Sequence, residues 1–132
     1  MKYVVDANVL FSALYDMDSN AGRLLLMAIE GNVELVSTEH VQSEMRDILA
    51  SKLGYSREEV EEALRALPVE WMERGIYEDV LPESLRVLSD EADASLLACA
   101  LTLDCEVVTG DKEVLSNKFR GVKVRKLRSV IQ

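Results

Sequence analysis

The sequence predicts an α/β fold, a three-layer α/β/α sandwich whose central twisted sheet has four or five mostly parallel strands. Short apolar segments alternate with segments of helical spacing along the chain, and this alternation is typical of a parallel sheet covered on both faces. Residues that cap helices precede the helical segments. No linker, repeat or low-complexity stretch interrupts the pattern, so the 132 residues are expected to form one domain, 1–132.

The elements follow one another in a regular order. The pattern predicts strands at 2–5, 33–36, 78–81, 105–109 and 122–127, helices over 21–30, 39–53, 56–67 and 91–103, and helical turns in 69–76 and 112–117. A side-chain oxygen just before a helix can accept from the free N–H groups of its first turn, and the residues in that position are Ser19, Thr38, Ser56 and Asp90. Glu59 completes a capping box with Ser56.

Charge is distributed unevenly along the chain. The net charge of −9 at first argues against a nucleic-acid partner. However, residues 58–93 carry twelve acids and three bases, whereas residues 112–128 carry seven bases and one acid. A basic C-terminal segment can bind phosphates even in an acidic protein, although a solvated basic surface is the alternative interpretation.

The sequence has no feature of a membrane or secreted protein. No apolar run approaches the roughly 20 residues that span a bilayer, and the N-terminus does not resemble a signal peptide. Cys99 and Cys105 lack CxxC spacing and a nearby histidine, which favours two reduced thiols over a disulfide or a zinc site. We therefore expect a cytoplasmic protein that does not contact membranes.

Two aspartates are expected at the same edge of the sheet. Asp6 interrupts the apolar stretch "YVVDANVLF", and Asp111 follows the apolar strand "EVVT". Ligands of such sheets bind outside the carboxyl ends of the strands, near the point where the strand order reverses. Either Asp6 is exposed to water at a strand end, or a positive group compensates its charge.

Two further acids interrupt apolar helix faces. Glu44 lies on the stripe that is formed by Val41, Met45, Ile48, Leu49 and Lys52. Asp93 lies one turn ahead of Leu96 and Leu97 in a helix that is apolar nearly all round. Each acid has a simpler explanation: Glu44 could sit at the edge of the stripe, while Asp90 and Asp93 could cap the helix and complement its dipole.

Together, however, these acids point to a metal site. Asp6, Glu44, Asp93 and Asp111 would repel one another unless a cation neutralised them. Oxygen ligands without cysteine or histidine suit Mg²⁺ or Mn²⁺ better than zinc. A site of this kind leaves coordination positions for water and a phosphate, which favours phosphoryl chemistry.

The chain resembles the PIN domain family of nucleases, which includes VapC-type toxins and RNA-processing endonucleases. The resemblance lies in "VVDANVL", "SEMRDIL", "DEADASLLACAL" and "VVTGDKEVL", and the last of these is the most specific. It implies a parallel sheet between helices and a cluster of acids that holds divalent metal. Carried over residue by residue, Asp6, Glu44, Asp93 and Asp111 are the metal-binding and catalytic acids. Asn8 and Thr109 would support them, and Asp90 would be an auxiliary acid.

The resemblance also implies an activity. We expect hydrolysis of phosphodiester bonds in single-stranded RNA, with 5′-phosphate and 3′-hydroxyl products. Asp6, Asp93 and Asp111 would hold Mg²⁺ or Mn²⁺, and Glu44 would orient or deprotonate the attacking water or bind a second metal. No separate organic cofactor is expected. Lys112, Lys118 and Arg120 are candidates for contact with the RNA backbone.

Partners follow from the same resemblance. A toxin of this family would have an antitoxin protein as its partner, and the family commonly forms homodimers. The apolar residues in 69–76 could serve such a dimer. His40, one turn before Glu44, is interpreted as structural. Trp71 is interpreted as core or subunit interface.

Other functions remain open at this point. An RNA-processing or surveillance nuclease, or a non-catalytic metal- or RNA-binding module of the same fold, would share the pattern. Phosphatases of the haloacid dehalogenase type need Asp-x-Asp after the first strand, and this chain has Asn8 in place of the second aspartate. Receiver domains need paired acids near the first strand and an aspartate ending the third, and neither feature occurs here.

Overall fold

The computed structural model describes residues 1–131 and contains a five-stranded sheet in which every pair of neighbouring strands is parallel. The strands are β1 (Lys2–Val5), β2 (Glu34–Thr38), β3 (Val69–Met72), β4 (Glu106–Thr109) and β5 (Val124–Lys126). Their order across the sheet is β3-β2-β1-β4-β5. The structure therefore confirms the predicted α/β class with its central parallel sheet.

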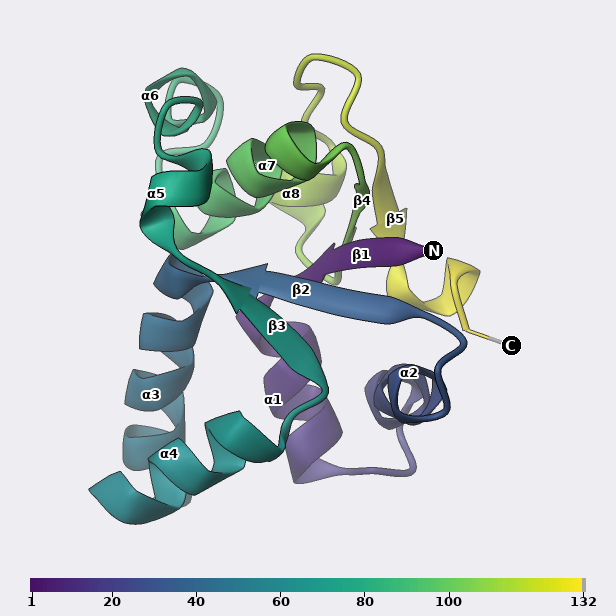
Figure 1. The fold of residues 1–132 in the computed structure, drawn as a ribbon, viewed down its shortest axis with the longest axis vertical. Helices are drawn as coiled ribbons and strands as arrows, with labels where there is room; N and C mark the ends of the chain where they lie inside the picture. Colours follow the sequence, from purple (N-terminus) through teal and green to yellow (C-terminus); the bar gives the residue numbers. More distant parts are fainter. Residues whose placement is uncertain (132) are drawn as a thin grey trace.

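Helices cover both faces of this sheet. They are α1 (Ala7–Tyr15), α2 (Asn20–Ile29), α3 (Glu39–Leu53), α4 (Arg57–Ala66), α5 (Arg74–Tyr77), α6 (Leu81–Ser84), α7 (Glu91–Leu103) and α8 (Lys112–Leu115), with a 3₁₀ turn η1 at Leu127–Ser129. Helix α7 packs on β1, β2 and β4 from one side, and α1 and α2 lie on the other (Figure 1). Helix α3 contacts both α1 and α7, so it joins the two helical layers.

The core is formed by the apolar strands and by the helix faces that cover them. Val4, Val5, Val107 and Val108 in the central strands have no or almost no exposed surface, as expected where helices cover both faces of a parallel sheet. Helix α7 contributes a buried run from Ala94 to Ala100. No helix within residues 1–131 combines the length and the apolarity needed to cross a membrane.

Local capping chemistry was predicted well. The side chains of Ser19, Thr38, Ser56 and Asp90 each accept a hydrogen bond from the first turn of the helix that follows. The capping box between Ser56 and Glu59 is present. Helix α3 ends at Gly54, whose φ of 67° lies in the left-handed region that glycine adopts without strain.

Three expectations about local structure were wrong. Residues 69–72 form the edge strand β3 rather than a helical turn, because they pair with β2. Residues 78–81 form no strand, since 78–80 form a turn and Leu81 begins α6. Lys52 is exposed rather than on the inner face of α3, with its ammonium 5.6 Å from the Phe11 ring centroid. The sequence analysis also missed α1 entirely.

Candidate active site

The strand order reverses between β1 and β4, and the carboxyl ends of these two strands carry Asp6 and Asp111. Only 5% of the Asp6 surface is exposed. Asp6 caps α1, with its carboxylate accepting from the backbone N–H of Val9 at 2.8 Å. Of the two alternatives for Asp6, exposure to water at a strand end is therefore excluded, because the carboxylate is buried and caps the next helix.

Thr109 connects the two aspartates. Its buried hydroxyl donates to the other carboxylate oxygen of Asp6 and accepts from the backbone N–H of Asp111 at 3.0 Å. Asp111 in turn caps α8, accepting from the N–H groups of Glu113 at 2.8 Å and Val114 at 3.3 Å. Both aspartates are thus held by helix starts, and Thr109 fixes their relative position.

Glu44 and Asp93 approach this edge from the two helices α3 and α7. Both side chains are half-buried. A hydrogen bond of 2.8 Å between the buried hydroxyls of Thr38 and Ser95 ties the start of α3 to α7. This bond fixes the position from which each helix presents its acid. Asp6, Glu44, Asp93 and Asp111 are called the acid cluster below.

Burial and the charges of neighbouring acids raise the pKa values of three members of the acid cluster, Asp6, Glu44 and Asp93. The pKa of Asp93 is raised to about 7, first by burial and then by the charges of Asp90, Asp111, Glu44 and Asp6. Burial also raises the pKa of Asp6, outweighing the hydrogen bonds from Thr109 and the backbone of Val9. The pKa of Glu44 is raised by burial first and by the charges of Asp90 and Asp6 after it. A bound cation would relieve this repulsion.

The donor set fits a hard divalent cation, with one restriction. No three His, Cys, Asp or Glu side chains in residues 1–131 are placed so that they could hold a metal ion by themselves. Mg²⁺ is usually bound through one or two carboxylates, with water and substrate phosphates completing the coordination. The acid cluster supplies carboxylate oxygens of this kind. It therefore suits Mg²⁺ or Mn²⁺ when water molecules fill the remaining coordination positions.

The predicted supporting residues have different surroundings. Asn8 is exposed on α1, and its side chain makes no hydrogen bond within the described residues. Asp90 accepts from the backbone N–H of Asp93 at 2.9 Å, so it positions the start of α7.

The three candidates for contact with the RNA backbone also differ in their surroundings. Lys112 directly follows Asp111. Lys118 is exposed in the loop after α8, and Arg120 forms an ion pair of 3.5 Å with Glu83 of α6.

Sequence reasoning missed the polar contacts that hold α3 beside α7. Besides Thr38 and Ser95, His40 bonds to Tyr77 with 2.6 Å between its Nδ1 and the phenolic oxygen. Tyr77 has no exposed surface, which agrees with a structural interpretation of His40. Hydroxyl residues inside apolar runs, such as "LVST" and "DASLL", are the signal that could have revealed the first pair.

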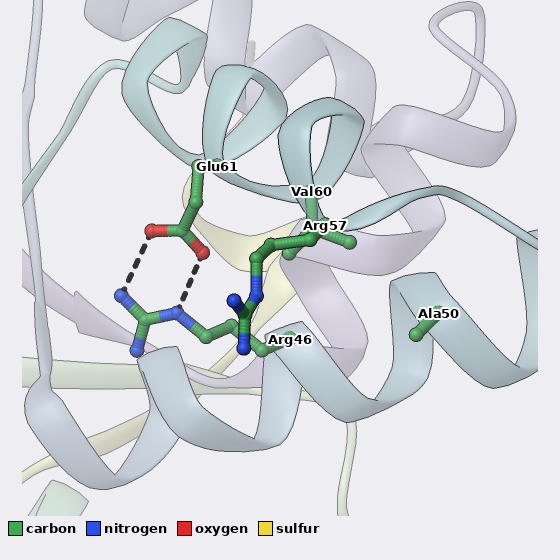
Figure 2. A pocket seen from close by; sticks show the side chains of 5 residues that line it. All are labelled: Arg46, Ala50, Arg57, Val60 and Glu61. Atoms are coloured by element: carbon green, nitrogen blue, oxygen red, sulfur yellow. Dashed lines mark hydrogen bonds and ion pairs between the residues drawn. The ribbon is translucent and has the colours of Figure 1, made fainter.

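One pocket among the described residues lies away from the acid cluster. It has a volume of about 510 Å³ and is formed between α3 and α4 by Arg46, Ala50, Arg57, Val60 and Glu61. Figure 2 shows the guanidinium of Arg46 facing the Glu61 carboxylate, with bonds of 2.8 and 3.2 Å. No member of the acid cluster lines it. Pocket size therefore does not locate the chemistry in this protein, whereas the clustered acids do.

The raised pKa values predict how stability depends on pH. Between about pH 4 and pH 7 the folded chain keeps a proton on Asp93 that the unfolded chain has lost. The free energy of unfolding without metal should therefore fall as the pH rises through this range. We expect a Tm in EDTA that is a few degrees lower at pH 8 than at pH 5.5.

Two variants test this assignment. Asp93→Asn should remove much of the fall in Tm, because the amide carries no charge at either pH. Asp104→Asn is the matched control, since Asp104 is exposed and has a left-handed φ of 54° that asparagine tolerates. Differential scanning fluorimetry across the pH range measures both. An equal fall in the parent and in Asp93→Asn would contradict the assigned repulsion.

Comparisons with known proteins agree with the fold. The sequence profile of the PIN domain matches residues 4–132. No curated protein gives a significant match.

Three solved structures are similar over nearly the whole chain. PAE2754 from Pyrobaculum aerophilum is 20% identical with a TM-score of 0.63, covering 98% of this chain and 85% of that one. VapBC2 from Rickettsia felis, solved with a DNA fragment from its promoter, is 15% identical with a TM-score of 0.68, covering 96% and 98%. VapBC-1 from nontypeable Haemophilus influenzae is 14% identical with a TM-score of 0.60, covering 97% and 99%. At these identities the likeness shows the shared fold.

Proposed function

This chain belongs to the PIN domain family, whose members are generally nucleases, and from this premise we propose that it is a divalent-metal-dependent endoribonuclease acting on single-stranded RNA. The observation that carries the proposal is the acid cluster at the point where the strand order reverses. The pKa values of three of its members, Asp6, Glu44 and Asp93, are raised by burial first and by neighbouring acids after it. Such repulsion is unfavourable in the free protein and favourable once a cation binds.

Each residue of the cluster has a proposed role. Asp6, Asp93 and Asp111 would hold, together with water that completes the coordination, the Mg²⁺ or Mn²⁺ that PIN nucleases usually use. When bound, the ion supplies a Lewis acid that lowers the pKa of water and neutralises charge on the scissile phosphate. Glu44 orients the attacking water and accepts its proton, for which a raised pKa is suitable. Thr109 keeps Asp6 in position through its hydroxyl bond.

We also propose that the protein is the toxin of a toxin–antitoxin pair. The support is structural, because two similar solved structures are VapBC complexes. The partners would be an antitoxin protein and a second copy of this chain, which could pair through residues 69–76. RNA as substrate and the free thiols Cys99 and Cys105 suit a cytoplasmic location.

Cleavage of labelled RNA tests the activity. Purified protein should cut a single-stranded RNA internally in Mn²⁺ or Mg²⁺, leaving 5′-phosphate and 3′-hydroxyl ends, and should not cut it in EDTA. A fully paired RNA duplex of the same sequence is the control substrate. Metal-dependent binding of RNA without cleavage would instead favour a non-catalytic module. A copurifying protein that blocks cleavage would support the antitoxin pairing, and an unblocked nuclease would favour RNA processing or surveillance.

Metal binding itself predicts a gain in stability. At pH 8, 10 mM Mg²⁺ should raise the Tm by about 5 °C, because a ligand that binds only the folded state stabilises it by mass action. Asp93→Asn should lose most of this gain, and Asp104→Asn should keep it. Differential scanning fluorimetry with Mg²⁺ against an equal ionic strength of NaCl gives the readout. A gain of the same size in NaCl would contradict a specific metal site.

A further inference from the structure

A second pocket opens beside the acid cluster, at the carboxyl end of β4. Its volume is about 330 Å³, and Thr109 and Gly110 form part of its wall. Three cations line it, Lys112 from α8, Lys126 from β5 and Arg128 from η1, together with the amide of Asn20 from α2. This pocket is called the basic pocket below. It joins elements from both ends of the chain, so the sequence segment 112–128 alone does not reveal it.

Among the described residues, the three cations have no acidic partner. Within residues 1–131 neither Lys112, Lys126 nor Arg128 forms an ion pair. Two other cations of the same segment are paired, Arg120 with Glu83 and Arg125 with Glu106. Three unpaired positive charges around one small pocket are unfavourable to each other until an anion enters.

Strand register places the basic pocket directly against the acid cluster. Strand β5 runs beside β4 (Figure 1), and Lys126 pairs across the sheet with Thr109. The hydroxyl of Thr109 in turn bonds to the Asp6 carboxylate. Thr109 therefore lies in the wall of the basic pocket and also contacts the acid cluster. An anion in the basic pocket would lie close to a group that is bound at the acid cluster.

Strand β2, which α3 follows, lies on the other side of β1 from β4 and β5, and the pocket between α3 and the start of α7 has the opposite charge. A pocket of about 290 Å³ there is lined by Glu44, Asp47, Asp90 and Glu91, with His40 as the single basic residue. Four carboxylates repel an entering phosphate at neutral pH. The two pockets that flank the cluster thus differ in sign, one attracting the backbone of a nucleic acid and the other repelling it.

We propose that the basic pocket binds the sugar–phosphate backbone of RNA on one side of the scissile bond, and that the strand on the other side is not held. The proposal rests on the proposed function, because it takes the acid cluster as the point of cleavage. Lys112, Lys126 and Arg128 contact backbone phosphates, and Asn20 lies where its amide reaches the sugar or a base edge. The pocket accommodates about one nucleotide unit, so the contact is local to the cleavage point.

Binding without cleavage tests the basic pocket by itself. Lys112→Gln, Lys126→Gln and Arg128→Gln are combined in an Asp6→Asn background, and affinity for a fluorescent single-stranded RNA is measured by anisotropy. We expect the affinity to fall at least about tenfold, and the slope of log affinity against log salt to decrease by about 2, for three lost phosphate contacts. The matched control combines Arg57→Gln, Arg65→Gln and Arg86→Gln, exposed cations that give the same change in net charge.

The control separates local binding from general electrostatics. Equal losses of affinity in the two triple variants, or no loss in the first, would overturn the basic pocket. Because this assay needs no catalysis, it can succeed even if the parent cleaves no RNA, in which case only the proposed nuclease function fails. Both triple variants should keep the parent Tm within about 2 °C, since all six side chains are exposed.

Binding of the RNA backbone on only one side of the scissile bond is tested with active protein and modified RNA. Single methylphosphonate groups, which carry no charge, replace phosphates one at a time on either side of the cleavage point. We expect kcat/KM to fall about fivefold or more for neutralised phosphates on one side only, and this sensitivity should vanish in the triple variant at Lys112, Lys126 and Arg128. Equal sensitivity on the two sides would overturn the asymmetry.

Discussion

Replacing Asp6 with asparagine is expected to lower metal-dependent RNA cleavage by about 100-fold or more while the protein stays folded. Even residues that only contact a metal ligand typically change activity by about 10–100-fold, and Asp6 is proposed to hold the ion itself. Its carboxylate is buried between β1, α1 and the Thr109 hydroxyl. No other carboxylate among residues 1–131 bonds to Thr109, so none takes over its position.

The fold should tolerate this change for a local reason. Asparagine is as good a helix cap as aspartate, so its carbonyl oxygen can still accept from the Val9 N–H. The amide also replaces a carboxyl group whose pKa is raised by burial, so it removes an unfavourable buried charge. The Tm of Asp6→Asn in EDTA at pH 8 should therefore equal or exceed that of the parent, which separates a catalytic loss from unfolding.

Asp104→Asn is the matched control, because it makes the same chemical change at an exposed residue at the end of α7. Its initial rate on a labelled RNA in Mn²⁺ should equal that of the parent. Equal rates in the parent and in Asp6→Asn would mean that a contaminating nuclease makes the cut and that the proposed site is wrong. A lower Tm for Asp6→Asn would mean that the carboxylate serves the fold rather than the metal.

The sequence predicted those structural features whose determining contacts are close together in the chain. Thr38 and Asp90 were recognised as caps because a cap acts within three residues, and both helices begin where expected. The alternation of strands and helices likewise placed Asp6 and Asp111 at the same edge. Strand β3 was missed because its structure depends on pairing with β2 some thirty residues away in sequence.

Helix α1 was missed for a different reason. Asp6 was interpreted only through its charge, as a strand-end or metal-binding acid, although Val9, Leu10 and Ala13 after it are spaced for a helix and are buried. An aspartate that ends a strand can also cap the helix that follows without any linker. In this chain the capping and the proposed metal-binding roles belong to the same side chain, so finding one explanation does not exclude the other.

The distribution of charge along the sequence does not predict which cations line the basic pocket. Lys112, Lys118 and Arg120 were chosen from the basic segment, but Arg120 is paired with Glu83. Lys126 and Arg128 instead lie beside Lys112, because the parallel pairing of β5 with β4 brings them there. The pKa of about 7 for Asp93 likewise depends first on burial and then on acids that include members of three other segments. Neither result can be obtained from a linear pattern.

Gly22 in α2 is expected to show the largest effect of a single substitution on stability. A Cβ at this position would lie 2.0 Å from the carbonyl oxygen of Met17 and 2.4 Å from its carbonyl carbon. These atoms belong to the backbone of the turn between α1 and α2, so no side-chain rotation can relieve the overlap. The turn would have to move away from the start of α2, where Gly22 also donates to Ser19 at 3.1 Å.

We therefore expect Gly22→Ala to lower the free energy of unfolding by about 3 kcal/mol, a large part of what a small domain has. Gly75→Ala is the matched control, because a Cβ there meets nothing within 4 Å and alanine favours the helical backbone of α5. Urea denaturation followed by circular dichroism should show a lower midpoint for the first variant and an equal or higher one for the second. Equal midpoints for Gly22→Ala and the parent would mean that the α1–α2 turn can shift at little cost. In that case Asn20, which lies in the same start of α2, could not be a fixed wall of the basic pocket.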